Sequence, residues 1–182
     1  MRLFLAIDPP DALLERVARA AAAVRTDGDG LRWSRPEDWH LTLVFLGEVD
    51  DEHRADLEKR IAAEVGRHEP LSLAVRGAGT FPGNDTRARV LWAGFEGDVG
   101  ALGRLAADLR RAARKSGIPV ERRPYVPHLT LARSRTPADF SRHRSSLRSM
   151  TTPFWTAEEV HLVHSVLGGS PRYRTVATWP LG

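Results

Sequence analysis

The stretch His40-Leu41-Thr42-Leu43 occurs a second time, letter for letter, as His128-Leu129-Thr130-Leu131. From ordinary residue frequencies, a second copy arises by chance with odds on the order of one in a few hundred in a chain of this length. In both copies apolar and polar residues alternate, which is the period of a half-buried strand. We therefore expect two strands, each with its His and Thr on one face and its two Leu on the other.

The pairing of an imidazole with a hydroxyl points to a definite chemistry. Histidine has an ordinary pKa of about 6.5, so it can give or take a proton near neutrality. If the two strands lie side by side, a neutral His can deprotonate a nucleophile while a protonated His delivers a proton to the leaving group. Each Thr hydroxyl can donate a hydrogen bond to an oxyanion between the rings. This combination is suited to metal-free phosphoester chemistry.

Working outward from the two motifs, the chain shows a repeated order of elements. Apolar spacing predicts a strand over 2–8, a helix over 11–24 and the first motif strand over 39–46, with a short strand possible at 31–34. After a helix over 51–65 and strands over 71–78 and 87–95, a helix over 102–113 precedes the second motif strand. The two His lie about half a chain apart, so we interpret the pattern as an internal duplication of a strand, helix and strand unit. Two lobes should then face each other across the motif strands.

The C-terminal third adds strands to this plan. Residues 136–150 are polar and rich in Arg and Ser, which fits either a short helix or a mobile flap. Strand patterns follow over 159–167 and 173–181, joined by a Gly- and Pro-containing turn. The predicted fold class is α+β: one domain over 1–182, bilobal, with pseudo-two-fold duplicated antiparallel sheets, flanking helices and a central cleft.

Composition narrows the function further. The absence of Cys excludes disulfides, thiolate nucleophiles and cysteine-based zinc sites. No apolar run is long enough to span a bilayer and no leader is visible, so we expect a cytoplasmic protein without membrane contact. The net charge is +4 and the pI is near 10.3, with the basic excess concentrated in residues 101–150 around the second motif. Arg outnumbers Lys by 25 to 2, which also fits codon bias, so the basicity by itself leaves nucleic-acid binding open.

The motifs and their flanks resemble a known family. Two His-x-Thr-x motifs half a chain apart are similar to those of the 2H phosphoesterase superfamily and, within it, to the bacterial RNA 2′,3′-cyclic phosphodiesterase family, also called the 2′-5′ RNA ligase family. The resemblance extends over essentially the whole chain. It includes the opening strand, the flanks of both motifs, the central hairpin and the last two strands, in the segments 2–7, 40–49, 81–92, 124–133 and 165–173.

The resemblance implies a bilobal fold and metal-independent hydrolysis of a 2′,3′-cyclic phosphate at an RNA 3′ end to a 2′-phosphomonoester. It implies that His128 is the proton acceptor, that His40 is the proton donor, and that Thr42 and Thr130 bind the phosphate. The symmetry of the motifs leaves the acid and base assignment open when spacing alone is considered. No nucleotide-binding loop is present, so we expect no cofactor and, at most, a reversible ATP-independent 2′-5′ ligation.

Three further residues are candidates for substrate binding. Arg133 follows His128 by five positions, which places it on the opposite face of an ideal strand, so a surface role is the alternative. Tyr125 could stack on a base or pack in the core, and Ser165 could bond to substrate or be an ordinary strand residue. The other five His have no motif context and are expected to be structural or solvent-facing, without a metal site.

Two alternative functions use the same residues. One is a non-catalytic RNA-end binding module, against which the intact His and Thr of both motifs argue. The other is an esterase for small cyclic nucleotides. The expected partner is an RNA 3′ end carrying a 2′,3′-cyclic phosphate. No protein partner is evident in the sequence, and we expect a monomer.

Overall fold

The computed structural model describes residues 1–182, which form two antiparallel sheets. Sheet A has the strand order β3-β1-β8-β9, and sheet B has the order β2-β6-β5-β4-β7. The strands of sheet A are β1 (Arg2–Ile7), β3 (Leu41–Glu48), β8 (Glu159–Ser165) and β9 (Tyr173–Pro180). Those of sheet B are β2 (Arg32–Trp33), β4 (Leu71–Phe81), β5 (Ala88–Gly97), β6 (His128–Ala138) and β7 (Trp155–Ala157). Both sheets combine strands from the two halves of the chain.

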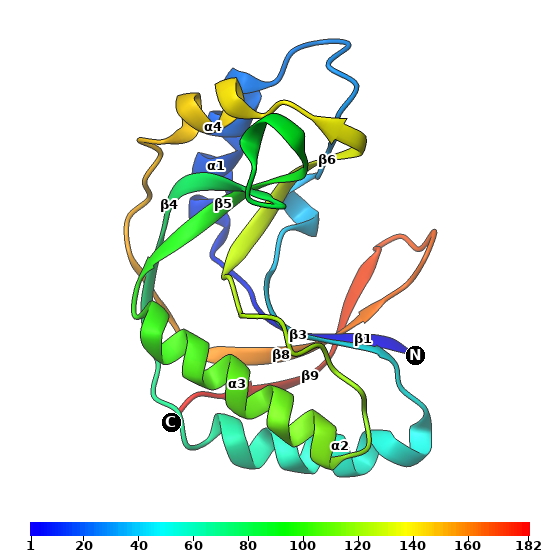
Figure 1. Ribbon diagram of the computed structural model, residues 1–182. Coiled ribbons are helices and arrows are strands. Elements are labelled where there is room, and N and C mark those ends of the chain that lie inside the picture. The colour runs from blue at the N-terminus through cyan, green and yellow to red at the C-terminus, as the bar shows by residue number, and fades with distance from the viewer.

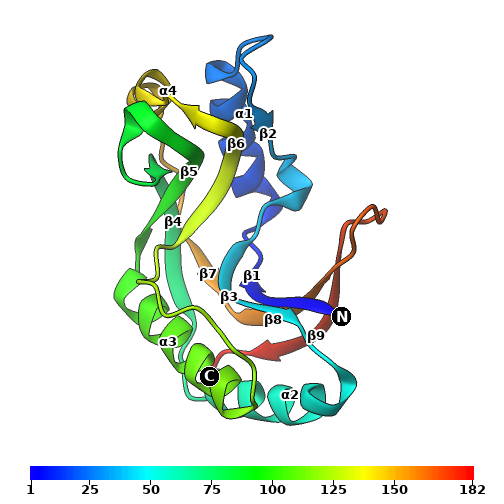
Figure 2. The same cartoon turned by 45° about the vertical axis from the view of Figure 1, so that its right-hand side comes forward.

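Four α-helices are present, and Figures 1 and 2 show that they flank the sheets. Helices α1 (Asp11–Val24) and α4 (Ser141–Leu147) lie beside sheet B, whereas α2 (Asp51–Val65) and α3 (Val99–Lys115) lie beside sheet A. Short 3₁₀ turns occupy Pro36–Asp38 and Asp85–Arg87. No helix has both the length and the apolar character needed to cross a membrane. The predicted α+β class with duplicated antiparallel sheets and flanking helices is confirmed.

The duplication has an exchanged arrangement of helices. The unit β1-α1-β3 has its strands in sheet A, but Leu13 and Val17 of α1 pack into the core of sheet B. The unit β5-α3-β6 has its strands in sheet B, but Leu102 and Leu105 of α3 pack into the core of sheet A. Each repeat therefore supplies the helix that covers the other repeat's sheet. Burial of these apolar faces is the main favourable contribution to holding the two lobes together.

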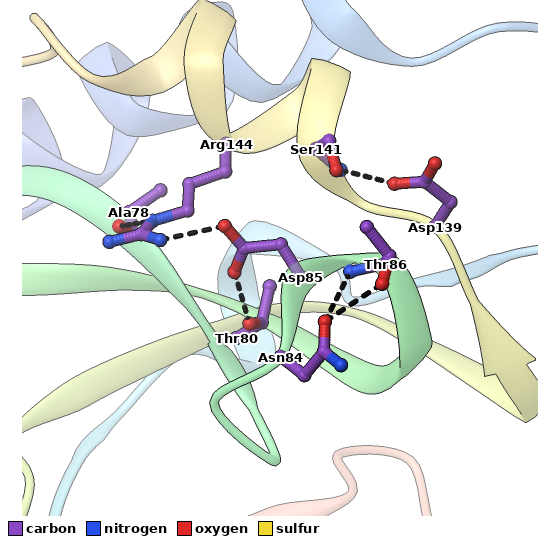
Figure 3. Close-up of polar contacts among 8 residues, drawn as sticks. All are labelled: Ala78, Thr80, Asn84, Asp85, Thr86, Asp139, Ser141 and Arg144. Carbon is purple, nitrogen blue, oxygen red and sulfur yellow. Dashed lines mark hydrogen bonds and ion pairs between the residues drawn. The ribbon is translucent and has the colours of Figure 1, made fainter.

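The connection between β4 and β5 is fixed by a polar network, shown in Figure 3. The carboxylate of Asp85 accepts hydrogen bonds from Thr80 Oγ1 at 2.6 Å and from the Arg144 guanidinium at 2.7 Å. The side-chain oxygen of Asn84 accepts from both the amide and the hydroxyl of Thr86. Because Arg144 belongs to α4, the network ties this helix to the end of β4, where Phe81 enters the cleft.

The segment 136–150 shows where sequence patterns were ambiguous. The second motif strand continues through Pro137 to Ala138, and the short-helix alternative is realised as α4 over Ser141–Leu147. The strand expected over 159–167 ends at Ser165. The three-residue β7 was not predicted, because a strand this short has too few residues to show a period.

Candidate active site

A single cleft of about 1400 Å³ brings together every residue that the sequence singled out. His40 and Thr42 line it from the first motif, on and next to β3 of sheet A, and His128 and Thr130 line it from β6 of sheet B. Arg133, Tyr125 and Ser165 line the same cleft. The expected central cleft with both motifs facing it is therefore present.

His40 is held by a carboxylate. Its Nδ1 lies 2.9 Å from Oδ1 of Asp8, a residue at the end of β1. Burial raises the pKa of Asp8, but the hydrogen bond to His40 and the charge of the imidazolium outweigh this effect, so its pKa is lowered overall. A carboxylate bound to Nδ1 stabilises the protonated ring. Nε2 of His40 is shielded from solvent and has no hydrogen-bond partner in the protein.

Asp8 has a second imidazole on its other side. Nε2 of His161, on β8, lies 3.6 Å from Oδ2 of Asp8, and Nδ1 of His161 lies 2.8 Å from the hydroxyl oxygen of Thr178 on β9. The neighbouring strands β8, β1 and β3 thus align His161, Asp8 and His40 in one row. His161 and Thr178 restrict the orientation of Asp8, which in turn restricts His40.

His128 has a different environment. Its Nδ1 lies 2.7 Å from the backbone carbonyl oxygen of Val126, an atom that can only accept, so Nδ1 carries the proton and the lone pair of the neutral ring is on Nε2. Burial lowers the pKa of His128, the hydrogen bond to Val126 opposes this shift, and the positive charge of Arg133 adds to it. The pKa of His128 is therefore lowered overall, and its ring stays neutral down to a lower pH than the ring of an ordinary histidine.

The difference between the two histidines comes from their neighbouring strands. In sheet A, Ile7 of β1 pairs with Leu41, so the next residue, Asp8, stands opposite His40. In sheet B, the residue of β5 that pairs with His128 is Gly94. A Cβ atom at Gly94 would lie 2.9 Å from the carbonyl oxygen of Arg76, so no side chain fits there. The histidine of the first motif therefore lies opposite a carboxylate, whereas the histidine of the second motif lies opposite a residue without a side chain.

Each histidine stands between two aromatic side chains. The ring of His40 makes edge contacts with Phe4 and Tyr173, with centroids 5.5 and 5.0 Å away. In the other lobe, the centroid of the His128 ring is 4.9 Å from that of Phe81 and 6.1 Å from that of Trp92. These contacts restrict both rings to one orientation, as a catalytic group requires.

Thr42 and Thr130 lie on the same face as the histidine two residues before each. Neither hydroxyl makes a hydrogen bond within the protein, although other hydroxyls, such as that of Thr80, do. Both side chains are only partly buried, and both face the cleft. Their hydroxyl protons are thus available to a ligand placed between the two rings.

The structure corrects the expected orientation of Arg133. Trp92 pairs with Thr130 and Leu91 with Ala132, so Leu131 is an extra residue in the ladder. This bulge buries both Leu131 and Ala132 and turns Arg133 onto the face of His128, where it lines the cleft. The expectation from an ideal strand was wrong because strict alternation ignores bulges.

The first motif contains the same irregularity. Ala6 pairs with Thr42 and Leu5 with Val44, which leaves Leu43 as the extra residue. The position equivalent to Arg133, five residues after the histidine, is therefore also on the cleft face, and it is occupied by Phe45, whose exposed fraction is 66%. One copy of the repeat thus offers an aromatic ring where the other offers a guanidinium.

Tyr125 links the two motif blocks. Its hydroxyl donates a 2.8 Å hydrogen bond to the backbone carbonyl of Thr42, and the guanidinium of Arg110 lies 5.7 Å from the centre of its ring. Burial raises the pKa of the Tyr125 phenol, so it stays a donor. Ser165 ends β8, pairs with Tyr173 and lines the cleft without a side-chain hydrogen bond.

The cleft is strongly basic. Two acidic residues, Asp38 and Glu121, line it, whereas its arginines are Arg2, Arg32, Arg35, Arg89, Arg110, Arg123, Arg133 and Arg172. Both acids form ion pairs with arginines of this set. Such an excess of guanidinium groups attracts a phosphate-bearing ligand and makes its binding sensitive to salt.

Sequence reasoning missed the residues that surround the motifs. Asp8 and His161 had no motif context, and the aromatic pairs are formed by residues far from the histidines in sequence. A carboxylate at the end of the strand that opens the repeat was visible, but its pairing with His40 depends on strand register. No local signal specifies that register.

Comparisons with known proteins agree with this architecture. A family model described as LigT like Phosphoesterase matches residues 7–92 and 97–173. The chain is similar to the RNA 2′,3′-cyclic phosphodiesterase of Geobacillus stearothermophilus, with 32% identity over 98% of this chain, and it spans 56% of that protein's length. It is also similar to the protein of the same name from Bacillus subtilis, with 32% identity over 82% of this chain and 80% of that protein.

Solved structures share the fold over the whole chain. A protein of Thermus thermophilus is similar with a TM-score of 0.79 and 31% identity, covering 100% of this chain and 98% of that one. E. coli LigT complexed with 3′-AMP is similar with a TM-score of 0.75 and 30% identity, covering 99% of this chain and 97% of that one.

Proposed function

Because the chain belongs to the LigT-like phosphoesterase family, we propose that it hydrolyses the 2′,3′-cyclic phosphate at the 3′ end of RNA to a 2′-phosphomonoester. The observation that carries this proposal is the pair of motif histidines in one cleft, with a carboxylate on Nδ1 of His40 and a carbonyl on Nδ1 of His128. Similar proteins named RNA 2′,3′-cyclic phosphodiesterase, and a similar LigT complexed with 3′-AMP, support it.

In this proposal His128 is the general base. Its Nδ1–H donates a hydrogen bond to the carbonyl of Val126, so the lone pair on Nε2 is available to accept a proton from a water molecule. The base takes one proton from that water, and the oxygen forms a bond to phosphorus as the bond from phosphorus to O3′ breaks. The lowered pKa of His128 keeps the base in its neutral form near neutral pH.

His40 is the general acid. The Asp8 carboxylate stabilises its imidazolium, and its Nε2 has no competing partner in the protein. Nε2 gives its proton to the departing O3′, which leaves a free 3′ hydroxyl and a 2′-phosphate. An unpaired buried nitrogen costs about 1–3 kcal/mol, and a hydrogen bond to the substrate oxygen recovers this cost. If the 5′ hydroxyl of a second RNA takes the place of water, the same steps form a 2′-5′ linkage as the bond from phosphorus to O3′ breaks, without ATP, and such ligation stays a prediction.

The hydroxyl groups of Thr42 and Thr130 donate hydrogen bonds to the non-bridging oxygens of the phosphate, where negative charge accumulates. The mechanism requires no metal. Two groups of His and carboxylate side chains are close enough to share an ion, and both lie outside the cleft. The first is Asp50, Glu52 and His53, and the second is Glu64, His68 and Asp108.

The size and charge of the cleft favour RNA over a small cyclic nucleotide. Its volume of about 1400 Å³ exceeds the roughly 300–1,000 Å³ of a typical small-molecule pocket. Its arginines extend beyond the four motif residues along both sheets. Action as a monomer and a cytoplasmic location stay predictions.

The test is product analysis on an oligonucleotide with a 2′,3′-cyclic phosphate end, in the presence of EDTA. We expect the 2′-phosphate as the only product. His40→Ala and His128→Ala should each lower kcat by about 10²–10⁴-fold, the usual contribution of one acid or base. His53→Ala, on the exposed start of α2, is the matched control and should retain full activity.

Three results would count against the proposal. A requirement for a divalent ion would exclude the metal-free mechanism, and a 3′-phosphate product would exclude His40 as the donor to O3′. Tight, salt-sensitive binding of the oligonucleotide without turnover at any pH would favour an RNA-end binding module instead.

A further inference from the structure

A single hydrogen bond joins the segment that carries the second motif to the strands of sheet A. The hydroxyl of Tyr125, in the connection that leads from α3 to His128, donates to the backbone carbonyl of Thr42 at 2.8 Å. No other hydrogen bond or ion pair of residues 118–138 reaches a strand of that sheet. The two halves of the proposed site are therefore tied together at one of its phosphate-binding threonines.

This hydrogen bond is made where the backbone of β3 has few other partners. β3 is the edge strand of sheet A, with β1 as its only neighbour, and the extra residue Leu43 interrupts its ladder directly after Thr42. Edge strands and bulges leave backbone groups unpaired. The second motif differs, because β6 lies between β2 and β5, and the carbonyl of its own extra residue, Leu131, accepts from the amide of Ser34 at 2.9 Å. Tyr125 thus gives the first motif a restraint that a neighbouring strand gives the second.

The side chain of Tyr125 is itself held in place. Its ring is partly buried against the core of sheet A, and the guanidinium of Arg110 lies over it, 5.7 Å from its centre. Nη1 of Arg110 also donates a 2.6 Å hydrogen bond to the backbone carbonyl of Arg123, in the same connection. Arg110 therefore covers one face of the ring while Thr42 binds the hydroxyl. These contacts fit a restraining role for Tyr125 better than stacking on a base of the substrate.

The other end of this link is anchored at the second motif. Val126, the residue after Tyr125, provides the backbone carbonyl that accepts the hydrogen bond from Nδ1 of His128. We propose that Tyr125 is a positioning residue, whose hydroxyl holds Thr42 at the correct place relative to His128 across the cleft. The inference rests on the proposed function, in which the Thr42 hydroxyl and the His128 ring act on one phosphate. Small displacements of such groups are costly to a reaction that depends on their alignment.

The test is a double-mutant cycle on kcat, with an oligonucleotide that ends in a 2′,3′-cyclic phosphate as substrate. Tyr125→Phe removes only the hydroxyl and should lower kcat about two- to tenfold, the usual net contribution of one hydrogen bond. KM should change less, because the charge on the phosphate oxygens that Thr42 binds increases in the transition state. In a Thr42→Val background no hydroxyl is left to position, so Tyr125→Phe should change kcat by less than about twofold. In a Thr130→Val background, the matched control, Tyr125→Phe should keep its full effect.

An equal loss of kcat with and without the Thr42 hydroxyl would overturn the proposal, since a general loosening of the segment adds to any other change. Unchanged kinetics in Tyr125→Phe would overturn it too, and a raised KM in Tyr125→Leu would then show that the ring stacks on a base. If the unaltered protein hydrolyses no cyclic end, the proposed function fails, and calorimetric titration with adenosine 2′-phosphate still tests the positioning role. Tyr125→Phe should then weaken binding in the original protein but not in Thr42→Val, and equal weakening in both would overturn the role.

Discussion

At the scale of single residues, two identical tetrapeptides have different chemical surroundings. His40 has the Asp8 carboxylate on Nδ1, whereas His128 has a backbone carbonyl there and Arg133 on the same face. Burial, together with the charge of Arg133, favours the neutral ring of His128 despite the hydrogen bond to Val126, whereas Nδ1 of His40 is held by a charged acceptor. The environment thus supports His40 as the acid and His128 as the base, although the motifs are the same.

This assignment predicts the pH dependence of Asp8→Asn. The rate should rise as His128 loses its proton, at a pH below that of an ordinary histidine because burial lowers its pKa. Removing the carboxylate takes away the group that holds Nδ1 of His40, so the rate should fall while the ascending limb stays at the same pH. A fall in kcat of about 10-fold to 100-fold at the optimum is expected, the usual size of such supporting contacts. The measurement is kcat and kcat/KM from about pH 4 to 9, the range in which histidines titrate.

The control for Asp8→Asn is Glu69→Gln, an exposed acid outside the cleft. It should leave both kcat and the ascending limb unchanged. An unchanged kcat in Asp8→Asn would mean that the carboxylate does not position His40. His161→Gln should lower kcat less than Asp8→Asn does, because its contact with Asp8 is longer, at 3.6 Å.

Sequence patterns identified the two histidines, the two threonines and Arg133 as candidates, and all of them line the cleft. Their identification was possible because motif residues are neighbours in the chain. Asp8, His161 and the aromatic walls were not identified, since their relation to the histidines runs across strands. Which residue stands opposite another depends on register, and register depends on the whole sheet.

At the scale of elements, bulges decide which side chains reach the cleft. The extra residues Leu43 and Leu131 turn Phe45 and Arg133 toward it, and alternation alone would place both on the other face. The element boundaries of α1 and α2 matched the sequence pattern because apolar spacing and end signals agree there. Bulges have no comparable signal, because the two adjacent buried residues also suit a fully buried strand.

The turn between β4 and β5 is the element whose stability we expect to be most sensitive to one charge. Asp85→Asn weakens the hydrogen bonds from Thr80 and Arg144 (Figure 3). We expect a loss of about 1.5–3 kcal/mol in the free energy of unfolding at neutral pH, the range for hydrogen bonds to charged groups. Urea unfolding measures it, with Asp27→Asn, an exposed acid outside this network, as the control.

The same variant has a predicted pH dependence. The hydrogen bond from Thr80, and then the one from Arg144, lower the pKa of Asp85 in the folded protein. A carboxyl group with a lowered folded pKa contributes stability above its unfolded pKa, about 3.9, and this contribution disappears as the pH falls through the folded value. The difference between the original protein and Asp85→Asn should therefore shrink below about pH 4. A difference that stays constant well below that pH would show that the charge of Asp85 contributes nothing.

At the scale of the whole molecule, the exchange of helices couples the two lobes. α1 follows a strand of sheet A but covers sheet B, and α3 follows a strand of sheet B but covers sheet A. Each sheet loses one of its two covering helices, α1 or α3, if the other repeat unfolds. The cleft between them is thus built on two sheets that depend on each other for their cores.

This coupling predicts one cooperative unfolding transition. Leu13→Ala in the core of sheet B and Leu105→Ala in the core of sheet A should each cost about 2–5 kcal/mol and shift the same midpoint. Tryptophan fluorescence and far-ultraviolet circular dichroism in urea should coincide for both variants. Two separate transitions, with each variant moving only one, would show that the lobes unfold independently.

The sequence by itself determined the chemistry and the class of fold. The repeated tetrapeptide specified the two imidazoles, the two hydroxyls and their strands, because successive side chains of a strand point to alternate faces of the sheet. Only the tertiary structure decided that Asp8 meets His40 while Gly94 meets His128, and that Arg32 meets Arg133. The physical reason is that these pairs join strands remote in sequence, whose register is set by the packing of two whole sheets and their exchanged helices. The two identical motifs therefore have different chemical surroundings, because different residues pair with their histidines.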